Sequence, residues 1–171
     1  GVQTCALPIL SITDARDEVV DFSNPYFYFK IITLVNKDFA AANNINEDSS
    51  IEDLRNSGGS FTGIANQVSV SIPASYDISV LEAADLATAV ENVVQGTADI
   101  LLMSANPVVQ AYAANPDKTM VVWSPWVSSP IGMAVNEGNA ELQALANDFI
   151  ATFTEPGGIY ETLSAKYDKD R

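Results

Sequence analysis

The chain has 171 residues, with 22 Asp and Glu against 8 Lys and Arg, which gives a formal net charge of −14 at pH 7. This charge opposes binding to nucleic acid and to an anionic membrane surface, so we expect neither partner. The sequence has no histidine and a single cysteine, Cys5, so we do not expect disulfides, zinc sites built from Cys and His, or a histidine-based catalytic triad.

Residues 1–9 read Gly-Val-Gln-Thr-Cys-Ala-Leu-Pro-Ile, which is the translation of a commonly used short-read sequencing adapter. Sequence and reading frame match together, which indicates a non-native, adapter-derived segment. Cys5 lies inside it. The natural fold is therefore expected to begin at residue 10.

From residue 10 onward the pattern predicts an α/β protein. Residues 30–35 form a first apolar strand, and residues 39–60 are predicted to be an exposed loop with one short helix at residues 51–55. Strand-like and helix-like segments then alternate, which is typical of an α/β sheet. The predicted strands of this block lie at residues 61–65, 78–81, 98–103 and 120–123, and another apolar strand follows at residues 131–135.

Three helices are predicted from periodicity and end signals. In residues 85–95 the apolar side chains share one helical face, and Gly96 is placed to end the helix. Residues 142–153 keep a 3.6-residue apolar period, with Asn139 as the expected cap. A last helix is expected at residues 159–166. No apolar stretch without charge approaches the roughly 18 residues needed to span a bilayer, so no membrane insertion is expected.

The segment from Ser11 to Tyr26 contains a candidate anion site. Arg16 follows three positions after Thr13, which is a good helix-capping residue. If Thr13 is the N-cap, the first backbone N–H groups of the helix lack partners, and Arg16 adds a planar guanidinium that suits a carboxylate. The sequence therefore predicts a carboxylate-binding site, and the alternative is that Arg16 is a solvated residue on a surface helix.

The same segment resembles the signature of the polar amino-acid solute-binding proteins of bacterial ABC importers, family 3. In that signature Ser-Ile-Thr-x-x-Arg is followed by Phe-Ser-x-x-Tyr, and the matching residues here are Ser11, Thr13, Arg16, Phe22, Ser23 and Tyr26. The resemblance covers nearly all of residues 10–169. It implies the two-lobed, type II periplasmic-binding fold, in which Ser11, Thr13 and Arg16 bind the carboxylate of the ligand.

The resemblance also implies how the lobes divide the chain. Residues 10–36 and 128–171 would form lobe one with the two hinge strands, and residues 37–127 would form lobe two. Family members have several dozen residues before the Ser-Ile-Thr motif, which supply the first strands of lobe one. We therefore expect an incomplete lobe one with an exposed sheet edge, and weak ligand binding by this chain alone or none.

In lobe two, the family has a Gly-rich turn with Ser or Thr that meets the same carboxylate. The segment from Gly63 to Ser69 occupies this place, although Gln67 and Val68 replace the usual Gly and hydroxyl residue. Ser69 is the remaining candidate hydroxyl donor, at the start of the second helix. The alternative is that Ser69 is simply an N-cap.

A larger departure lies five residues after Asp99, where amino-acid binders normally have an aspartate that pairs with the ammonium of the ligand. Ser104 stands there instead, which removes a charge-assisted hydrogen bond and puts the ligand class in doubt. Three alternatives stay open: Asn106 compensates, an acidic residue elsewhere compensates, or the ligand has a carboxylate without an amine. Asp99 itself is expected to have a structural role.

The aromatic residues suggest two alternatives. Tyr26, Phe27, Tyr28 and Phe29 either line the cleft or pack in the core on one face, and alternation favours the core. Trp123 and Trp126 either reach the mouth of the cleft or pack in the core or an interface, which is the favoured interpretation.

These features predict the substrate-binding component of an ABC importer that captures a small carboxylate-bearing solute, an amino acid or a related compound. Arg16, Ser11 and Thr13 would hold the solute from one lobe, and Ser69 and Ser104 from the other. No cofactor, metal or catalytic residue is expected. The expected partner is a membrane permease, the full-length protein is expected to be a monomer, and the location is expected to be periplasmic or extracellular. The alternatives are a sensory domain of a receptor or histidine kinase, and an enzyme on the same scaffold, for which no acid and base pair can be named.

Overall fold

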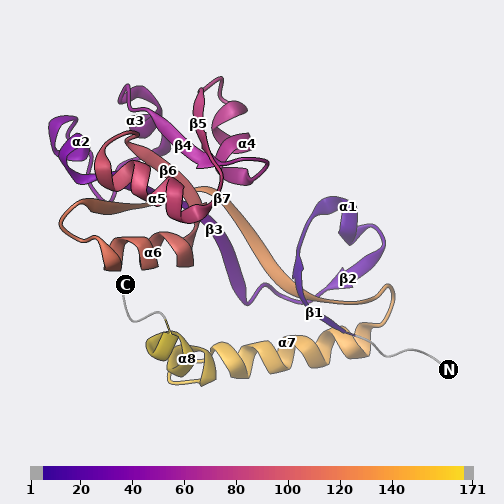
Figure 1. Cartoon of the computed structure of the whole chain (residues 1–171). Helices are drawn as coiled ribbons and strands as arrows, with labels where there is room; N and C mark the ends of the chain where they lie inside the picture. Colours follow the sequence, from indigo (N-terminus) through magenta and orange to yellow (C-terminus); the bar gives the residue numbers. More distant parts are fainter. Residues whose placement is uncertain (1–5, 168–171) are drawn as a thin grey trace. The chain divides into compact units, whose positions relative to one another are not determined.

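The computed structural model describes residues 6–167, so part of the adapter-like segment, residues 1–5, lies outside the described residues. The chain divides into two compact units: unit 1 has the residues up to Phe29 and from Ser129 onward, and unit 2 is Lys30–Ser128. Two strands, β3 (Phe27–Asn36) and β7 (Thr119–Asn136), carry the chain from one unit to the other (Figure 1). They include both apolar strands predicted at residues 30–35 and 131–135.

Strand β7 is a single strand of 18 residues, where the sequence pattern predicted two separate strands. Pro125 and Pro130 lie inside it, on either side of the boundary between the units after Ser128. Proline has no backbone N–H, so neither residue donates a hydrogen bond to a neighbouring strand. The two prolines interrupt the apolar pattern of the sequence, although both lie inside the strand.

Unit 2 has the strand order β7-β3-β6-β4-β5. Strand β4 is parallel to both β5 and β6, whereas β3 runs antiparallel to β6. The remaining strands of this unit are β4 (Phe61–Ile64), β5 (Val80–Ala83) and β6 (Ile100–Ser104), and its helices are α2 (Lys37–Ala42), α3 (Ile51–Asn56), α4 (Val68–Ala74), α5 (Leu86–Gln95) and α6 (Ala105–Ala114). The alternation of strands and helices confirms the predicted α/β class.

Both faces of this sheet are buried, because helices cover each of them. Alternate residues of β3 enter different apolar clusters: Ile31 and Val35 pack with Leu54 of α3, whereas Ile32 and Leu34 pack with Val93 of α5 and Val108 of α6. A strand that is buried on both faces has a continuous apolar sequence, which residues 31–35 largely show. Unit 2 therefore has two core clusters, one on each side of the sheet.

The helix ends of unit 2 follow local sequence signals. Asp85 caps α5 by accepting a hydrogen bond from the backbone N–H of Thr88 at 2.8 Å, and Gly96 ends that helix with a left-handed backbone (φ 72°). Helix α2 was missed by the sequence analysis, which placed a loop there. Its signal is Asn36, whose side-chain oxygen accepts hydrogen bonds from the backbone N–H groups of Asp38 and Phe39.

Strand β5 begins two residues later than predicted, because Ile78 is held in a turn by a hydrogen bond to the carbonyl of Pro73.

In unit 1, the second half of β7 pairs with two antiparallel partners, which belong to the same seven-stranded sheet. Ala134 is paired with Leu7 on one side and Phe22 on the other, so β1 (Leu7–Ser11) and β2 (Val20–Phe22) flank β7. The helices of this unit are α1 (Asp14–Asp17), α7 (Ala140–Thr154) and α8 (Ile159–Tyr167). Asn139 caps α7 as predicted, by accepting a hydrogen bond from the backbone N–H of Leu142.

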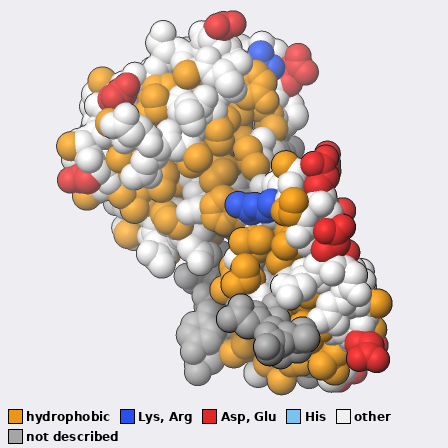
Figure 2. Space-filling view, turned by 90° about the vertical axis from the view of Figure 1, so that its right-hand side faces the viewer, with side chains coloured by type: hydrophobic (Ala, Val, Ile, Leu, Met, Phe, Trp, Pro, Cys, Tyr) orange, Lys and Arg blue, Asp and Glu red, His pale blue; other side chains and the backbone are white. Residues whose placement is uncertain are grey.

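The buried core of unit 1 is small. Both apolar clusters belong wholly to unit 2, and α7 buries only Ala146 and Ile150 of its predicted apolar stripe, while Leu145 is 64 % exposed. Most of the large apolar side chains that are exposed belong to unit 1: Leu7, Ile9, Val19, Phe27, Tyr28, Phe29, Leu145, Phe149, Ile159 and Leu163. Figure 2 shows one face of the molecule, on which apolar side chains reach the surface and basic ones are few. Within residues 6–167, no helix is long and apolar enough to cross a bilayer.

Unit 2 has a larger buried apolar core than unit 1, so we expect unit 2 to be the more stable of the two. We expect hydrogen exchange to be slow in β3 residues 31–35 and in β6, and faster by at least about an order of magnitude in β1, β2 and α8, because little apolar surface is buried around the latter. Hydrogen–deuterium exchange with mass spectrometry measures both units in one sample. Equal protection of the two units would contradict this expectation.

Candidate functional site

The first group of predicted site residues lies on the turn between β1 and β2 in unit 1. Thr13 is the N-cap of α1, as expected, and its carbonyl accepts hydrogen bonds from the backbone N–H groups of Arg16 and Asp17, both at 2.9 Å. The Thr13 hydroxyl does not cap the helix. Helix α1 has four residues, so its backbone contributes much less field than a long helix would.

Arg16 is fixed by a contact within the motif. Its Nη1 donates a hydrogen bond of 2.9 Å to the carbonyl oxygen of Ser11, and its side chain is exposed. Asp14, Asp17 and Glu18 are exposed neighbours, but none of the described acidic side chains forms an ion pair with Arg16. The structure thus brings Ser11, Thr13 and Arg16 together, with a guanidinium that has donors left for an anion.

The second group lies in unit 2, where parallel strands end. Strands β4 and β6 are parallel neighbours, so Ile64 and Ser104 at their carboxyl ends share one edge of the sheet. Helix α4 begins just after β4, and α6 begins directly after β6. Ligands of open α/β sheets bind at such carboxyl edges. The structure therefore places Ser69 of α4 and Ser104 at the same edge.

The turn between β4 and α4 depends on Gly63 and Ser69. A Cβ atom on Gly63 would lie 2.5 Å from the carbonyl oxygen of Ser69, so only glycine fits there. The alternative that Ser69 is an N-cap is wrong. Gln67 has the N-cap position, and Ser69 lies in the first turn of α4. Ser69 has no exposed surface, and its Oγ accepts a hydrogen bond of 2.9 Å from the backbone N–H of Ile64. A direct contact between Ser69 and a ligand stays a prediction, and it requires a side chain that is covered here to become exposed.

The structural role of Ser69 gives a test. We expect Ser69→Ala to lower the free energy of unfolding by about 1–3 kcal/mol, because the buried N–H of Ile64 loses its acceptor. Denaturant unfolding of the two proteins measures the change. Ser71→Ala, an exposed serine of the same helix, is the matched control and should change stability little. Equal effects of the two substitutions would show that the Ser69 hydroxyl does not support the turn.

Ser104 is placed differently from Ser69. It ends β6, is the N-cap residue of α6, and is half-buried, and its hydroxyl makes no capping hydrogen bond to the helix. At the other end of β6, Asp99 accepts hydrogen bonds from the backbone N–H and the hydroxyl of Ser60, at 2.8 and 2.7 Å. The structural role expected for Asp99 is confirmed. The Ser104 hydroxyl, in contrast, is not used by the helix that it begins.

Lys30, which is not among the predicted site residues, lies next to this edge. It is exposed and directly precedes Ile31, the residue of β3 that is paired with Ser104. The sequence feature that could have pointed to Lys30 is a lysine at the beginning of the otherwise apolar segment 30–35.

The aromatic residues separate into two groups. Phe27, Tyr28 and Phe29 are 41–50 % exposed, so the expectation that they pack in the core is wrong; the reason is that the buried part of β3 begins only at Ile31. The expectation for Trp126 is confirmed, since it is buried and its Nε1 donates a hydrogen bond to the hydroxyl of Thr33 at 2.9 Å. Trp123 is half-buried and packs against the cluster beneath α5 and α6.

Asp85 is an exposed acidic residue at the start of α5, after β5. Hydrogen bonds from the backbone N–H and then the side chain of Thr88 lower the pKa of Asp85 below its usual 3.8, with a smaller effect from the backbone N–H of Ala87. A carboxyl whose folded pKa is lowered stabilises the fold above its unfolded pKa. That contribution is lost as the pH falls through the folded pKa.

We therefore expect a pH-dependent difference between the wild type and Asp85→Asn, which keeps a capping side chain without a titrating charge. Near neutral pH the wild type should have the higher Tm, and the difference should shrink as the pH falls below about 4. Thermal unfolding followed by circular dichroism at several pH values measures it. A difference that stays constant down to about pH 2 would contradict the assignment.

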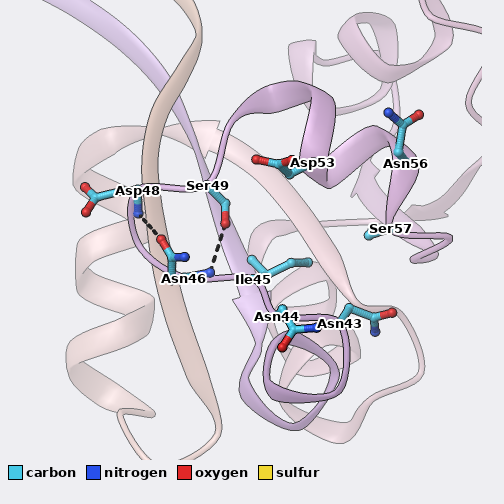
Figure 3. A pocket seen from close by; sticks show the side chains of 9 residues that line it. All are labelled: Asn43, Asn44, Ile45, Asn46, Asp48, Ser49, Asp53, Asn56 and Ser57. Atoms are coloured by element: carbon cyan, nitrogen blue, oxygen red, sulfur yellow. Dashed lines mark hydrogen bonds between the residues drawn. The ribbon is translucent and has the colours of Figure 1, made fainter.

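A separate polar hollow of about 720 Å³ lies in unit 2, between α2 and α3. Figure 3 shows its amide, hydroxyl and carboxylate side chains, including Asn46, whose Oδ1 accepts from the backbone N–H of Asp48. It is lined by Asn43, Asn44, Ile45, Asn46, Asp48, Ser49, Asp53, Asn56 and Ser57. None of the predicted site residues is among them, so this hollow is distinct from the edge with Ser104. Within residues 6–167 no cluster of three or more acidic or Cys side chains is arranged for a metal ion.

The sequence profile of the bacterial extracellular solute-binding proteins, family 3, matches residues 5–169. The chain belongs to this family. The predicted family and the type II periplasmic-binding fold are thereby confirmed. A search of curated proteins gives no significant match.

Solved structures agree with this fold. An ancestral cationic amino acid solute-binding protein is 25 % identical, with a TM-score of 0.66 over 94 % of this chain and 69 % of its own. A putative binding component of an ABC transporter from Wolinella succinogenes DSM 1740, in complex with lysine, is 20 % identical, with a TM-score of 0.62 over 94 % of this chain and 70 % of its own. A histidine kinase sensor domain with similarity to periplasmic binding proteins is 21 % identical, with a TM-score of 0.56 over 95 % of this chain and 68 % of its own.

Proposed function

We propose that this family 3 protein is the substrate-binding component of an ABC importer, and that it captures a small carboxylate-bearing solute, an amino acid or a related compound. The solute binds between two lobes that close about the strands β3 and β7, and the closed form is presented to a membrane permease. The protein works as a monomer in the periplasm or outside the cell, without covalent chemistry or a cofactor. Binding in this way stabilises the closed state by bridging the lobes.

The observation that carries the proposal is the geometry of Arg16. The hydrogen bond from Nη1 to the carbonyl of Ser11 orients the guanidinium while leaving other N–H donors free for a carboxylate. Ser11 ends β1, and Thr13, the N-cap of α1, follows two residues later. An ancestral cationic amino acid solute-binding protein and a binding component in complex with lysine support the class of solute, because both ligands have a carboxylate.

A sensory domain of a receptor or histidine kinase is a second candidate. The similarity to a histidine kinase sensor domain supports it. The sensory alternative uses the same ligand contacts, so it differs in the partner and not in the site. Co-purification with a permease or with a signalling module distinguishes the two.

Arg16→Ala should weaken binding of the carboxylate ligand by about tenfold or more, because a charge-assisted pair is lost. The ligand is first identified by a thermal-shift screen of amino acids, dicarboxylates and keto acids. Titrations followed by NMR then measure weak dissociation constants for the wild type and the variant. Arg55→Ala, which changes an exposed arginine stacked on Tyr76 in unit 2, is the control. Unchanged affinity in Arg16→Ala would reject the role of Arg16.

A further inference from the structure

Helix α4 of unit 2 (Figure 1) is held in place by few buried side chains. Of its seven residues only Ser69 and Pro73 are buried, and Ile72 is half-buried against the cluster that contains Trp126. Pro73 has no backbone N–H, so it cannot donate a helical hydrogen bond to the carbonyl of Ser69, four residues earlier. A helix this short depends on tertiary contacts for its stability. The contacts at the two ends of α4 are therefore important for its position.

The contact after the last turn of α4 is made by Tyr76. Its ring meets the ring of Trp126 edge to face, with the ring centres 5.7 Å apart. Trp126 is itself fixed, because it is buried, donates a hydrogen bond to Thr33 and meets Phe61 edge to face. Arg55 Cζ lies 4.4 Å from the centre of the Tyr76 ring, and this exposed cation–π contact contributes less than a buried one would. Tyr76 thus attaches the end of α4 to a fixed part of unit 2, mainly through Trp126.

The segment that contains α4 is bounded by two residues with a left-handed backbone. Asn66 (φ 62°) directly precedes the N-cap Gln67, and Asp77 (φ 59°) directly follows Tyr76. This conformation is less favourable than a right-handed or extended one for residues other than glycine, and Asn and Asp are among those that adopt it most readily. Rotating either residue out of it moves the backbone to a more favourable region. Both positions therefore favour movement of the segment between them.

We propose that residues 66–77, the α4 flap, open as one unit, and that the contact of Tyr76 with Trp126 controls how often they open. Opening breaks the hydrogen bond from the backbone N–H of Ile64 to Ser69 Oγ. It also exposes the Ser69 hydroxyl, which has no exposed surface in this structure. The flap therefore controls access to one of the predicted ligand contacts. The role in ligand binding rests on the proposed function, whereas the opening itself does not.

Amide hydrogen exchange followed by ¹⁵N–¹H NMR measures the opening at both ends of the flap. The Ile64 N–H reports on one end, because it donates to Ser69 Oγ, and the Ile78 N–H reports on the other, because it donates to the carbonyl of Pro73. In the wild type we expect similar protection factors at Ile64 and Ile78, lower than that of Leu101 in β6 by about tenfold or more. Dissimilar protection at the two ends, or protection of Ile64 equal to that of Leu101, would overturn the inference.

Tyr76→Ala tests the control of the opening. It should lower the protection factors of Ile64 and Ile78 together, by about tenfold, because the ring contact with Trp126 is lost. Tyr76→Phe keeps the ring and should leave both values nearly unchanged. An effect of Tyr76→Ala at Ile78 alone would mean that Tyr76 supports only its own turn, and the inference would be wrong.

Tyr112→Ala is the matched control for a general loss of stability. Tyr112 is a half-buried tyrosine of α6, and it packs against the cluster with Val93 and Val108 instead of the cluster with Trp126. We expect it to leave the protection of Ile64 unchanged. If it lowers this protection as much as Tyr76→Ala does, Ile64 exchanges by unfolding of the whole unit and the inference fails. None of these measurements uses a ligand, so their outcome is independent of Arg16 and of the proposed function.

Discussion

The structure of unit 2 depends on strand β6, which is hydrogen-bonded on both sides. It pairs with β3 from Ile31 to Val35 and runs parallel to β4, and its residues Ile100, Leu101 and Leu102 are almost fully buried. Breaking either ladder would leave buried backbone groups without partners, which is costly. The same pairing fixes which residues meet at the carboxyl edge of the sheet. Both the position of Ser104 and that of its neighbour Lys30 follow from this register.

Much of the fold could be predicted because unit 2 is buried on both faces and its helices have clear end signals. Residues 86–95 are an example, since apolar periodicity, Asp85 and Gly96 all indicate the same helix. The predictions that were wrong involve residues whose burial is set by distant partners. Phe27, Tyr28 and Phe29 have the composition of a core strand, but they are exposed and belong to neither of the two apolar clusters. Helix α2 was missed because Asn, Asp and Ala also suit a loop.

The candidate site could be predicted only in part, for a similar reason. The motif around Arg16 is local, so its turn and its contact with Ser11 follow from neighbouring residues. Ser69 depends on how closely α4 approaches Gly63, and spacing along the sequence does not show that the side chain becomes fully buried. Lys30 and Ser104 are more than seventy positions apart, and only the pairing of β3 with β6 makes them neighbours. Periodicity within one segment contains no information on such a pair.

The two prolines in β7 have a mechanical consequence. Pro125 and Pro130 bracket the place where the chain leaves one unit for the other, and each removes one N–H donor from the strand. Proline also keeps the preceding residue extended, so β7 keeps the same direction here, although Pro125 and Pro130 donate no cross-strand hydrogen bonds. Bending β7 at this place therefore costs no backbone N–H hydrogen bond at Pro125 or Pro130, since neither residue has an N–H group. The two prolines thus make this part of β7 a candidate hinge point, although prolines in a sequence usually indicate the end of a strand.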